Sequence, residues 1–187
     1  KRLEDLFKSK KYYELETETK NLIQKYPNIA ALFNILGFAL QKKGDLDSAI
    51  ENFEKAISID PNFIFAHNNL GNAYKDLGKF NEAFNKYEEA IKLKPDYAEA
   101  YYNQGCLHRD NFNYNESIER FEKAIKIKPD YFDAYINLGF VLRNIGKLDA
   151  AIKNYQKTIS LNPGYLEAYN NILFTLFYSN KDNLKYN

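Results

Sequence analysis

The sequence predicts an all-α solenoid in which helix-turn-helix repeats stack side by side. Residues 30–165 divide without gaps into four segments of equal length that carry the same residue types at the same positions. Each segment contains two stretches with apolar residues at helical spacing, and each closes on a proline, which ends a helix. A helix pair of this length cannot bury its apolar faces alone, so neighbouring pairs must stack.

The repeats are residues 30–63, 64–97, 98–131 and 132–165, and positions are counted from the first residue of each. Position 8 is glycine, position 24 is aromatic, position 32 is proline, and positions 20 and 27 are small. These residues are Gly37, Gly71, Gly105 and Gly139; Phe53, Tyr87, Phe121 and Tyr155; Pro61, Pro95, Pro129 and Pro163; Ala49, Ala83, Ser117 and Ala151; and Ala56, Ala90, Ala124 and Thr158. We expect the position 8 glycines to pack against the small residues at positions 20 and 27.

Within each repeat, the turn between the helices has its own signals. Gly44, Gly78 and Gly146 are placed to end the first helix in a left-handed conformation. Position 18 is Asp or Asn in all four repeats, which suits the N-cap of the second helix. The side chains at this position belong to Asp47, Asn81, Asn115 and Asp149.

The two flanks resemble incomplete repeats. Residues 1–29 fit most of a diverged N-terminal capping repeat, and residues 166–187 fit a partial C-terminal repeat. No linker composition interrupts the chain. We therefore expect residues 1–187 to form a single solenoid.

This spacing resembles the tetratricopeptide repeat (TPR), whose pattern has an aromatic at position 4, Leu at 7, Gly at 8, Tyr at 11, Ala at 20, an aromatic at 24, Ala at 27 and Pro at 32. The four repeats match it at 25 of 32 positions. His67 replaces the first aromatic and Gln104 replaces the leucine. Leu40, His108 and Leu142 replace the tyrosine.

Composition argues against several classes of function. The chain has 26 Lys and Arg against 25 Asp and Glu, so its net charge of +1 offers no electrostatic reason for a nucleic-acid or membrane partner. One Cys and two His do not favour a zinc site, and no glycine-rich phosphate loop occurs. His67 and His108 fall at core positions. We expect no catalytic residue, no metal and no cofactor, and a cytoplasmic protein.

The resemblance implies that positions 2, 5, 6, 9, 12 and 13 of each first helix face a concave groove that binds an extended peptide. The candidate groove residues are Asn34, Phe38, Asn68, Asn69, Asn72, Lys75, Tyr102, Asn103, Arg109, Asn137, Phe140, Arg143, Asn170 and Asn171.

Position 6 forms an asparagine column, which consists of Asn69, Asn103, Asn137 and Asn171. An amide both donates and accepts, so this column could hold the backbone of an extended peptide. That interpretation expects side-chain amides without intramolecular partners at Asn69, Asn103 and Asn137. The alternatives are that each asparagine bonds to the neighbouring repeat, or that the column only reflects the high asparagine content of the chain.

Position 12 is basic in three successive repeats, as Lys75, Arg109 and Arg143. One interpretation is a series of cations that selects acidic side chains. The other is a solvated helix end with weak local ion pairs, because Asp76 and Asp110 follow at position 13.

Two functions stay open. The first is a non-enzymatic interaction scaffold that binds a protein or peptide. The second is the substrate-recognition segment of a glycosyltransferase whose catalytic domain is absent from this chain. Residues 66–73 resemble the repeats of O-linked N-acetylglucosamine transferases, and residues 167–176 resemble the junction at which bacterial relatives pass from repeats into the glycosyltransferase domain. The chain contains no Met, which favours a fragment of a longer protein.

The segment 172–178 has six apolar residues of seven, so a helix there is apolar all round. We expect stacking to cover its Tyr169, Ile172, Leu173 and Leu176 side. Phe174, Phe177 and Tyr178 would then stay open for self-association or for a following domain, unless residues 180–187 fold back over them.

Overall fold

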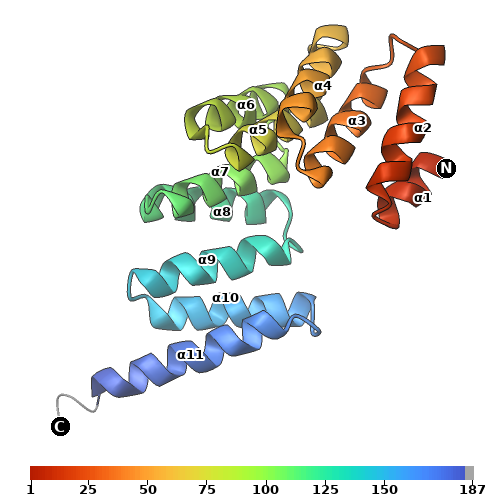
Figure 1. Cartoon of the computed structure of the whole chain (residues 1–187). Helices are drawn as coiled ribbons and strands as arrows, with labels where there is room; N and C mark the ends of the chain where they lie inside the picture. Colours follow the sequence, from red (N-terminus) through yellow and green to blue (C-terminus); the bar gives the residue numbers. More distant parts are fainter. Residues whose placement is uncertain (184–187) are drawn as a thin grey trace. The chain divides into compact units, whose positions relative to one another are not determined.

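A computed structural model describes the backbone of residues 1–183 and the side chains of residues 1–177. The described chain is helical and contains no strand (Figure 1). Its helices are α1 (Arg2–Lys8), α2 (Tyr12–Lys25), α3 (Ala30–Lys43), α4 (Leu46–Ile59), α5 (Ile64–Asp76), α6 (Phe80–Leu93), α7 (Ala98–Asp110), α8 (Tyr114–Ile127), α9 (Phe132–Asn144), α10 (Leu148–Leu161) and α11 (Leu166–Asn183). The predicted all-α solenoid of helical repeats is confirmed.

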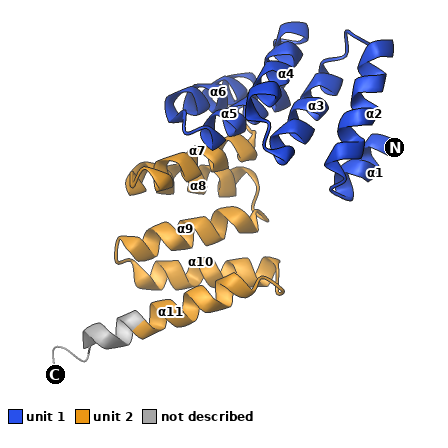
Figure 2. Cartoon of the chain, in the orientation of Figure 1, with its two compact units in different colours: residues 1–95 blue, residues 96–187 orange. Residues whose placement is uncertain are grey.

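The helices form two compact units (Figure 2). Unit 1 is residues 1–95 and holds α1 to α6; unit 2 is residues 96–187 and holds α7 to α11. In each unit consecutive helices pack together, and the first helices of adjacent repeats also touch: α3 contacts α5, α7 contacts α9, and α9 contacts α11. Residues of the first helices therefore lie side by side within a unit.

Each repeat closes around a glycine and an aromatic ring. A Cβ atom placed on Gly71 would lie 2.5 Å from Cε1 of Tyr87, so only glycine leaves room for that ring. The same holds for the other position 8 glycines, and all four position 24 rings are fully buried. The expected glycine contact was thus partly wrong. The nearest side chain is the aromatic at position 24, and the position 20 residue touches the glycine backbone, as where Ser117 Oγ donates to Gly105 O at 2.8 Å.

The turn inside each repeat is shorter than the sequence indicated. Gly44, Gly78 and Gly146 adopt φ values of 87°, 74° and 78°, which confirms the left-handed helix end. The amide of the residue after the left-handed one then donates back into the first helix, as from Asp45 N to Leu40 O at 3.0 Å. That same residue is already the N-cap of the second helix.

The predicted N-caps at position 18 are therefore wrong. The caps are Asp45, Lys79, Asn113 and Lys147, two residues earlier. The side chains at position 18 lie inside the first helical turn, where an acidic group still favours the positive end of the helix dipole.

The N-terminal flank contributes two helices, α1 and α2. Leu6 of α1 and Leu15 of α2 are buried against Ala39 of α3. The left-handed position in the α1–α2 turn is Lys10, with φ 55°. The C-terminal flank contributes one helix, α11, which packs on α10 and α9.

Candidate functional site

The candidate groove residues of unit 1 lie on α3 and α5, where most of them already have partners. Asn69 Nδ2 donates to Asn34 Oδ1 at 2.9 Å, which ties α5 to α3. Asn72 Oδ1 accepts from the buried Tyr87 hydroxyl at 2.8 Å. Asn68 is buried, with 6% of its surface exposed, and so does not face an open groove. These amides serve the packing of unit 1.

The remaining unit 1 candidates are Phe38 and Lys75. Phe38 packs against the ring of Phe7 from α1, with centroids 4.7 Å apart, and Lys42 Nζ lies 5.2 Å from the Phe38 ring. Lys75 is partly buried in the last turn of α5.

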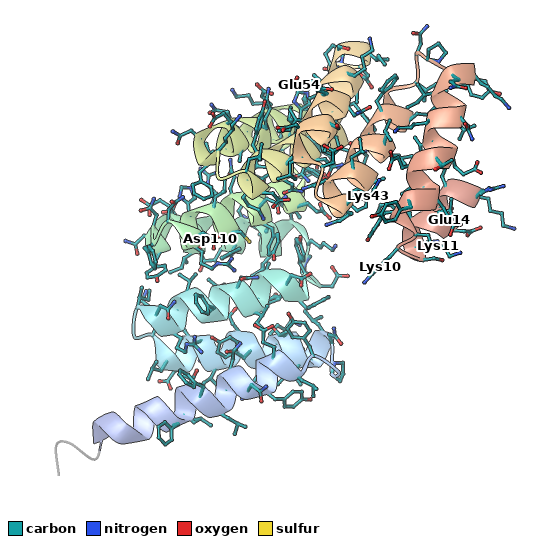
Figure 3. All side chains as sticks on the ribbon, in the orientation of Figure 1. Lys10, Lys11, Glu14, Lys43, Glu54 and Asp110 are labelled. Atoms are coloured by element: carbon teal, nitrogen blue, oxygen red, sulfur yellow. The ribbon has the colours of Figure 1, made fainter. Side chains whose placement is uncertain are left out.

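Unit 1 contains a hollow of about 370 Å³, which is lined by basic and acidic side chains together. Figure 3 labels Lys10, Lys11, Glu14 and Lys43 around it. Lys43 bonds to Glu16, and this contact raises the pKa of Lys43. Lys11 pairs with Glu14 in the same way, and this hollow is smaller than the one in unit 2, so we do not take it as the site.

The larger hollow belongs to unit 2 and measures about 610 Å³. Its walls come from α7, α9 and α11, from the start of α8 and the turn before it, and from the turn before α11. They are formed by Arg109, Asp110, Phe112, Tyr114, Ile136, Asn137, Phe140, Tyr165, Glu167 and Asn171. Asp110 is labelled at the end of α7 in Figure 3. The hollow is thus rich in aromatic rings, with amides and charges among them.

Asn137 is the polar centre of this hollow. Its Nδ2 donates to the Tyr102 hydroxyl at 3.2 Å and to Asp133 O at 2.8 Å, while its Oδ1 accepts from Nη1 of Arg109. Burial raises the pKa of Tyr102, so the hydroxyl stays protonated at neutral pH. Asn171 in the next repeat accepts from Arg143 Nη1 at 3.2 Å.

The asparagine column therefore differs from the expectation of free amides. At Asn69 and Asn137 the amide bonds to position 5 of the preceding repeat, and at Asn137 and Asn171 it accepts from the arginine at position 12 of that repeat. Stacking brings these positions together, and a partly buried amide is stabilised by such a bond. Asn103, in the same column, also has a partner. The alternative, bonding between repeats, is the one observed.

Six residues that line the hollow were not among the candidates. Asp110, Ile136 and Glu167 occupy groove positions of the repeat, whereas Phe112, Tyr114 and Tyr165 lie outside those positions. Phe112 occupies position 15, where the other three repeats have glycine. It keeps the left-handed conformation, with φ 59°, and 75% of its surface is exposed. Its ring meets that of Tyr114 edge to face, with centroids 6.1 Å apart. The replacement of a repeated glycine was a signal that could have revealed it.

The last candidate, Asn170, is exposed on α11. His67 is packed as expected, with its ring nitrogens 3.0 Å from Glu89 Oε2 and 2.9 Å from Pro61 O. In the part of the chain that the structure describes, no cluster of His, Cys, Asp or Glu is placed to hold a metal ion. None of the described helices has the length and apolarity needed to cross a bilayer.

Comparison with solved structures finds the same fold. The chain matches MamA with a TM-score of 0.71 and 24% identity, covering 89% of this chain and 98% of that one. It matches TTC0263 of Thermus thermophilus with a TM-score of 0.80 and 18% identity, covering 94% and 95%. It matches YrrB with a TM-score of 0.67 and 20% identity, covering 87% and 84%. No curated protein matches the sequence significantly.

Two family models match the repeated part of the chain. A model described as "TPR repeat" matches residues 37–78, 71–111 and 105–146, and one described as "Tetratricopeptide repeat" matches residues 132–165, which is the fourth repeat without a shift. Together with the helix pairs and the glycine–aromatic contacts, these matches show that the chain belongs to the tetratricopeptide repeat family.

Proposed function

We propose that this chain is a non-enzymatic interaction scaffold that binds an extended peptide segment in the unit 2 hollow. TPR proteins are protein-interaction scaffolds, and YrrB, which shares the fold, is described as having "an unusual peptide-binding site". The hollow has the mixture that such sites use, with apolar rings providing contact area and a few polar groups fixing orientation.

The observation that carries the proposal is the conformation of Phe112. A left-handed backbone costs a bulky residue roughly 1–2 kcal/mol more than it costs glycine. Three repeats avoid this cost with Gly44, Gly78 and Gly146, whereas the third repeat keeps a phenylalanine whose ring is mostly exposed. The ring therefore adds little to the core and is placed at the rim of the hollow. Strain of this kind collects at functional sites.

The neighbouring side chains extend the same surface. Tyr114, Phe140 and Tyr165 contribute rings to the walls, and Phe140 is 36% exposed. Exposed aromatic side chains with few rotatable bonds are the usual anchors of peptide recognition. The asparagine column takes a supporting role, because its amides at Asn137 and Asn171 hold the helices that carry these rings.

The test is the pair of variants Phe112→Gly and Phe112→Ala. A peptide is first selected from a random display library on the immobilised full chain, synthesised with a fluorophore, and titrated by anisotropy. We expect both variants to weaken its binding by about tenfold, because both remove the ring. Phe112→Gly should also raise the free energy of unfolding by about 1 kcal/mol, whereas Phe112→Ala keeps a Cβ atom and gains less.

Loss of affinity together with a gain of stability cannot come from damage to the fold. Phe65→Ala, which removes an exposed ring in unit 1, is the matched control and should leave the affinity unchanged. If both Phe112 variants bind the selected peptide as tightly as the wild type, or if selection yields no peptide, the proposal is wrong.

The second candidate is the recognition segment of an O-linked glycosyltransferase. It rests on the resemblance of residues 167–176, which fold as part of α11. Catalysis would then come from a domain outside these 187 residues. The sequence of the parent gene tests it, since a nucleotide-sugar-binding domain in the same reading frame is required.

A further inference from the structure

Arg143, in the last turn of α9, is held in place without a carboxylate. Its guanidinium lies 5.2 Å from the ring centre of Phe140 on α9 and 5.1 Å from that of Phe174 on α11. Nη1 donates to Asn171 Oδ1 at 3.2 Å. Among the described side chains, none of the ion pairs includes Arg143. Two rings and one amide thus fix the guanidinium, and no described carboxylate neutralises its charge.

Arg109, at the same position of the preceding repeat, provides the contrast. Its Nε and Nη2 donate to Asp110 Oδ1 at 2.9 and 2.7 Å, and its Nη1 donates to Asn137. All three of its nitrogens are therefore used inside the chain. The residue after Arg143 is Asn144, so the fourth repeat has no equivalent of Asp110. Of these two arginines in equivalent positions, only Arg109 has a carboxylate partner among the described side chains.

The Nε and Nη2 groups of Arg143, for which no described side chain is an acceptor, are suited to bind a carboxylate. A guanidinium carries five N–H groups in a planar fork that matches a carboxylate with two parallel hydrogen bonds. The flanking rings limit the rotation of the plane and shield it from part of the solvent, so less order is lost when a carboxylate binds. Arg143 is partly buried, which leaves part of the fork open to a ligand.

Arg143 is also continuous with the unit 2 hollow. Phe140 and Asn171, both of which contact Arg143, line that hollow. The two acidic residues that line the hollow already have partners. Asp110 is bound by Arg109, and Glu167 Oε2 accepts from the Tyr165 hydroxyl at 3.2 Å. A peptide whose apolar residue enters the hollow would bring an adjacent residue over Arg143.

From this geometry we propose that Arg143 binds an Asp or Glu side chain of the peptide, next to an apolar residue that occupies the hollow. The inference rests on the function proposed above and adds the chemistry of the partner, an acidic and apolar segment. It also gives different roles to two arginines at the same position of the repeat. Arg143 binds the carboxylate of the peptide, and Arg109 holds the side chains of the hollow in place.

The experiment begins with the display selection on the full chain and reads the composition of the selected peptides. We expect enrichment of Asp and Glu relative to the unselected library. One selected peptide is then synthesised with acetylated and amidated ends, so that its only carboxylates are side chains. Changing its acidic residue to the amide should weaken binding to the wild type by about tenfold.

The variants then locate the effect. On Arg143→Gln the acidic and amide peptides should bind equally, and on Arg143→Lys the discrimination should fall to an intermediate value, since a lysine keeps the charge without the fork. Arg109→Gln is the matched control. It should change the affinity for both peptides by the same factor and so leave their ratio unchanged. Circular dichroism melting curves check that each variant is folded.

Each outcome has a distinct meaning. Selected peptides without acidic enrichment, or discrimination that survives in Arg143→Gln, overturn this inference while leaving the peptide scaffold intact. A further peptide carries the amide substitution but has a free C-terminal carboxylate. If it binds as tightly as the acidic peptide, the inference is also overturned, because Arg143 would then recognise the peptide's C-terminus and not an acidic side chain. A selection that yields no peptide overturns the proposed function as well.

Discussion

The Tyr87 hydroxyl donates a 2.8 Å hydrogen bond to Asn72 Oδ1, whereas the hydroxyl of Tyr155, the equivalent residue two repeats later, is buried with no partner among the described side chains. The difference lies at position 9 of the first helix. It is Asn72 in the second repeat and Phe140 in the fourth. Phe140 thus gives the unit 2 hollow an aromatic ring but leaves a buried hydroxyl unsatisfied.

This contrast predicts opposite effects of one substitution at two equivalent sites. Tyr87→Phe should lower the free energy of unfolding by about 1 kcal/mol, because a satisfied hydrogen bond is lost. Tyr155→Phe should leave it unchanged or raise it by about 1 kcal/mol, because a buried unsatisfied hydroxyl is removed. Both rings are fully buried, so each variant controls for the other. Urea denaturation measures both, and an equal loss at the two sites would contradict the assignment.

The glycines divide into two classes that substitution can separate. At Gly71 a new Cβ atom would lie 2.5 Å from the Tyr87 ring, so Gly71→Ala should cost about 2 kcal/mol and Gly71→Leu more. At Gly78 nothing lies within 4 Å of such an atom, but φ is +74°. Gly78→Ala should therefore cost only about 1 kcal/mol, from backbone strain alone. Thermal unfolding of the variants ranks them, and a larger loss at Gly78 would refute the packing argument.

A pH dependence follows from His108 on α7. Burial, reinforced by the charge of Arg120, lowers the pKa of His108 below its ordinary value of 6.5. The unfolded chain then takes up a proton before the folded one does, so stability is lost as the pH falls from about 6.5 through the folded pKa. Glu16 and Glu89 also have lowered pKa values, but they act below about pH 4.5.

Urea midpoints measured from roughly pH 8 to pH 5 test this dependence. The wild type should lose stability over that range, and His108→Gln should lose less. A variant with the same slope as the wild type would show that other groups cause the loss.

The exposed face of α11 differs from the sequence-based expectation and supports a prediction of self-association. Ala168 and Thr175 are fully buried, whereas Leu173, which was expected to be covered, is 67% exposed, and Phe177 is 65% exposed. The side chain of Tyr178 and the segment 180–187 lie outside the described side chains. Exposed apolar patches of this kind favour association, so we expect the chain to dimerise through α11 as its concentration rises.

Light scattering across a concentration series tests the association, with Leu173→Ser/Phe177→Ser as the variant. The double variant should remain monomeric at concentrations where the wild type does not. Phe65→Ser, which removes one exposed ring from unit 1, should behave as the wild type. A wild type that is monomeric throughout would disprove the prediction.

The sequence by itself determined the all-α fold, the repeat and its period. The same residue types recur in every repeat because each repeat has the same local needs. Gly71 leaves room for the Tyr87 ring, and Gly44 adopts the left-handed conformation that ends a helix. The candidate groove residues came from the resemblance to the tetratricopeptide repeat, which assigns certain positions of each first helix to a groove, and they stay a prediction.

Only the tertiary structure decided what the polar residues do. Asn69 and Asn137 find partners 35 residues away, and those partners exist only because stacking brings position 5 of one repeat beside position 6 of the next. The same stacking places Arg143 between two rings with no carboxylate partner in the described part of the chain, while Arg109 is neutralised by its neighbour. Hydrogen bonds and ion pairs depend on distances of a few tenths of an ångström between repeats, and a pattern of residue types does not contain those distances.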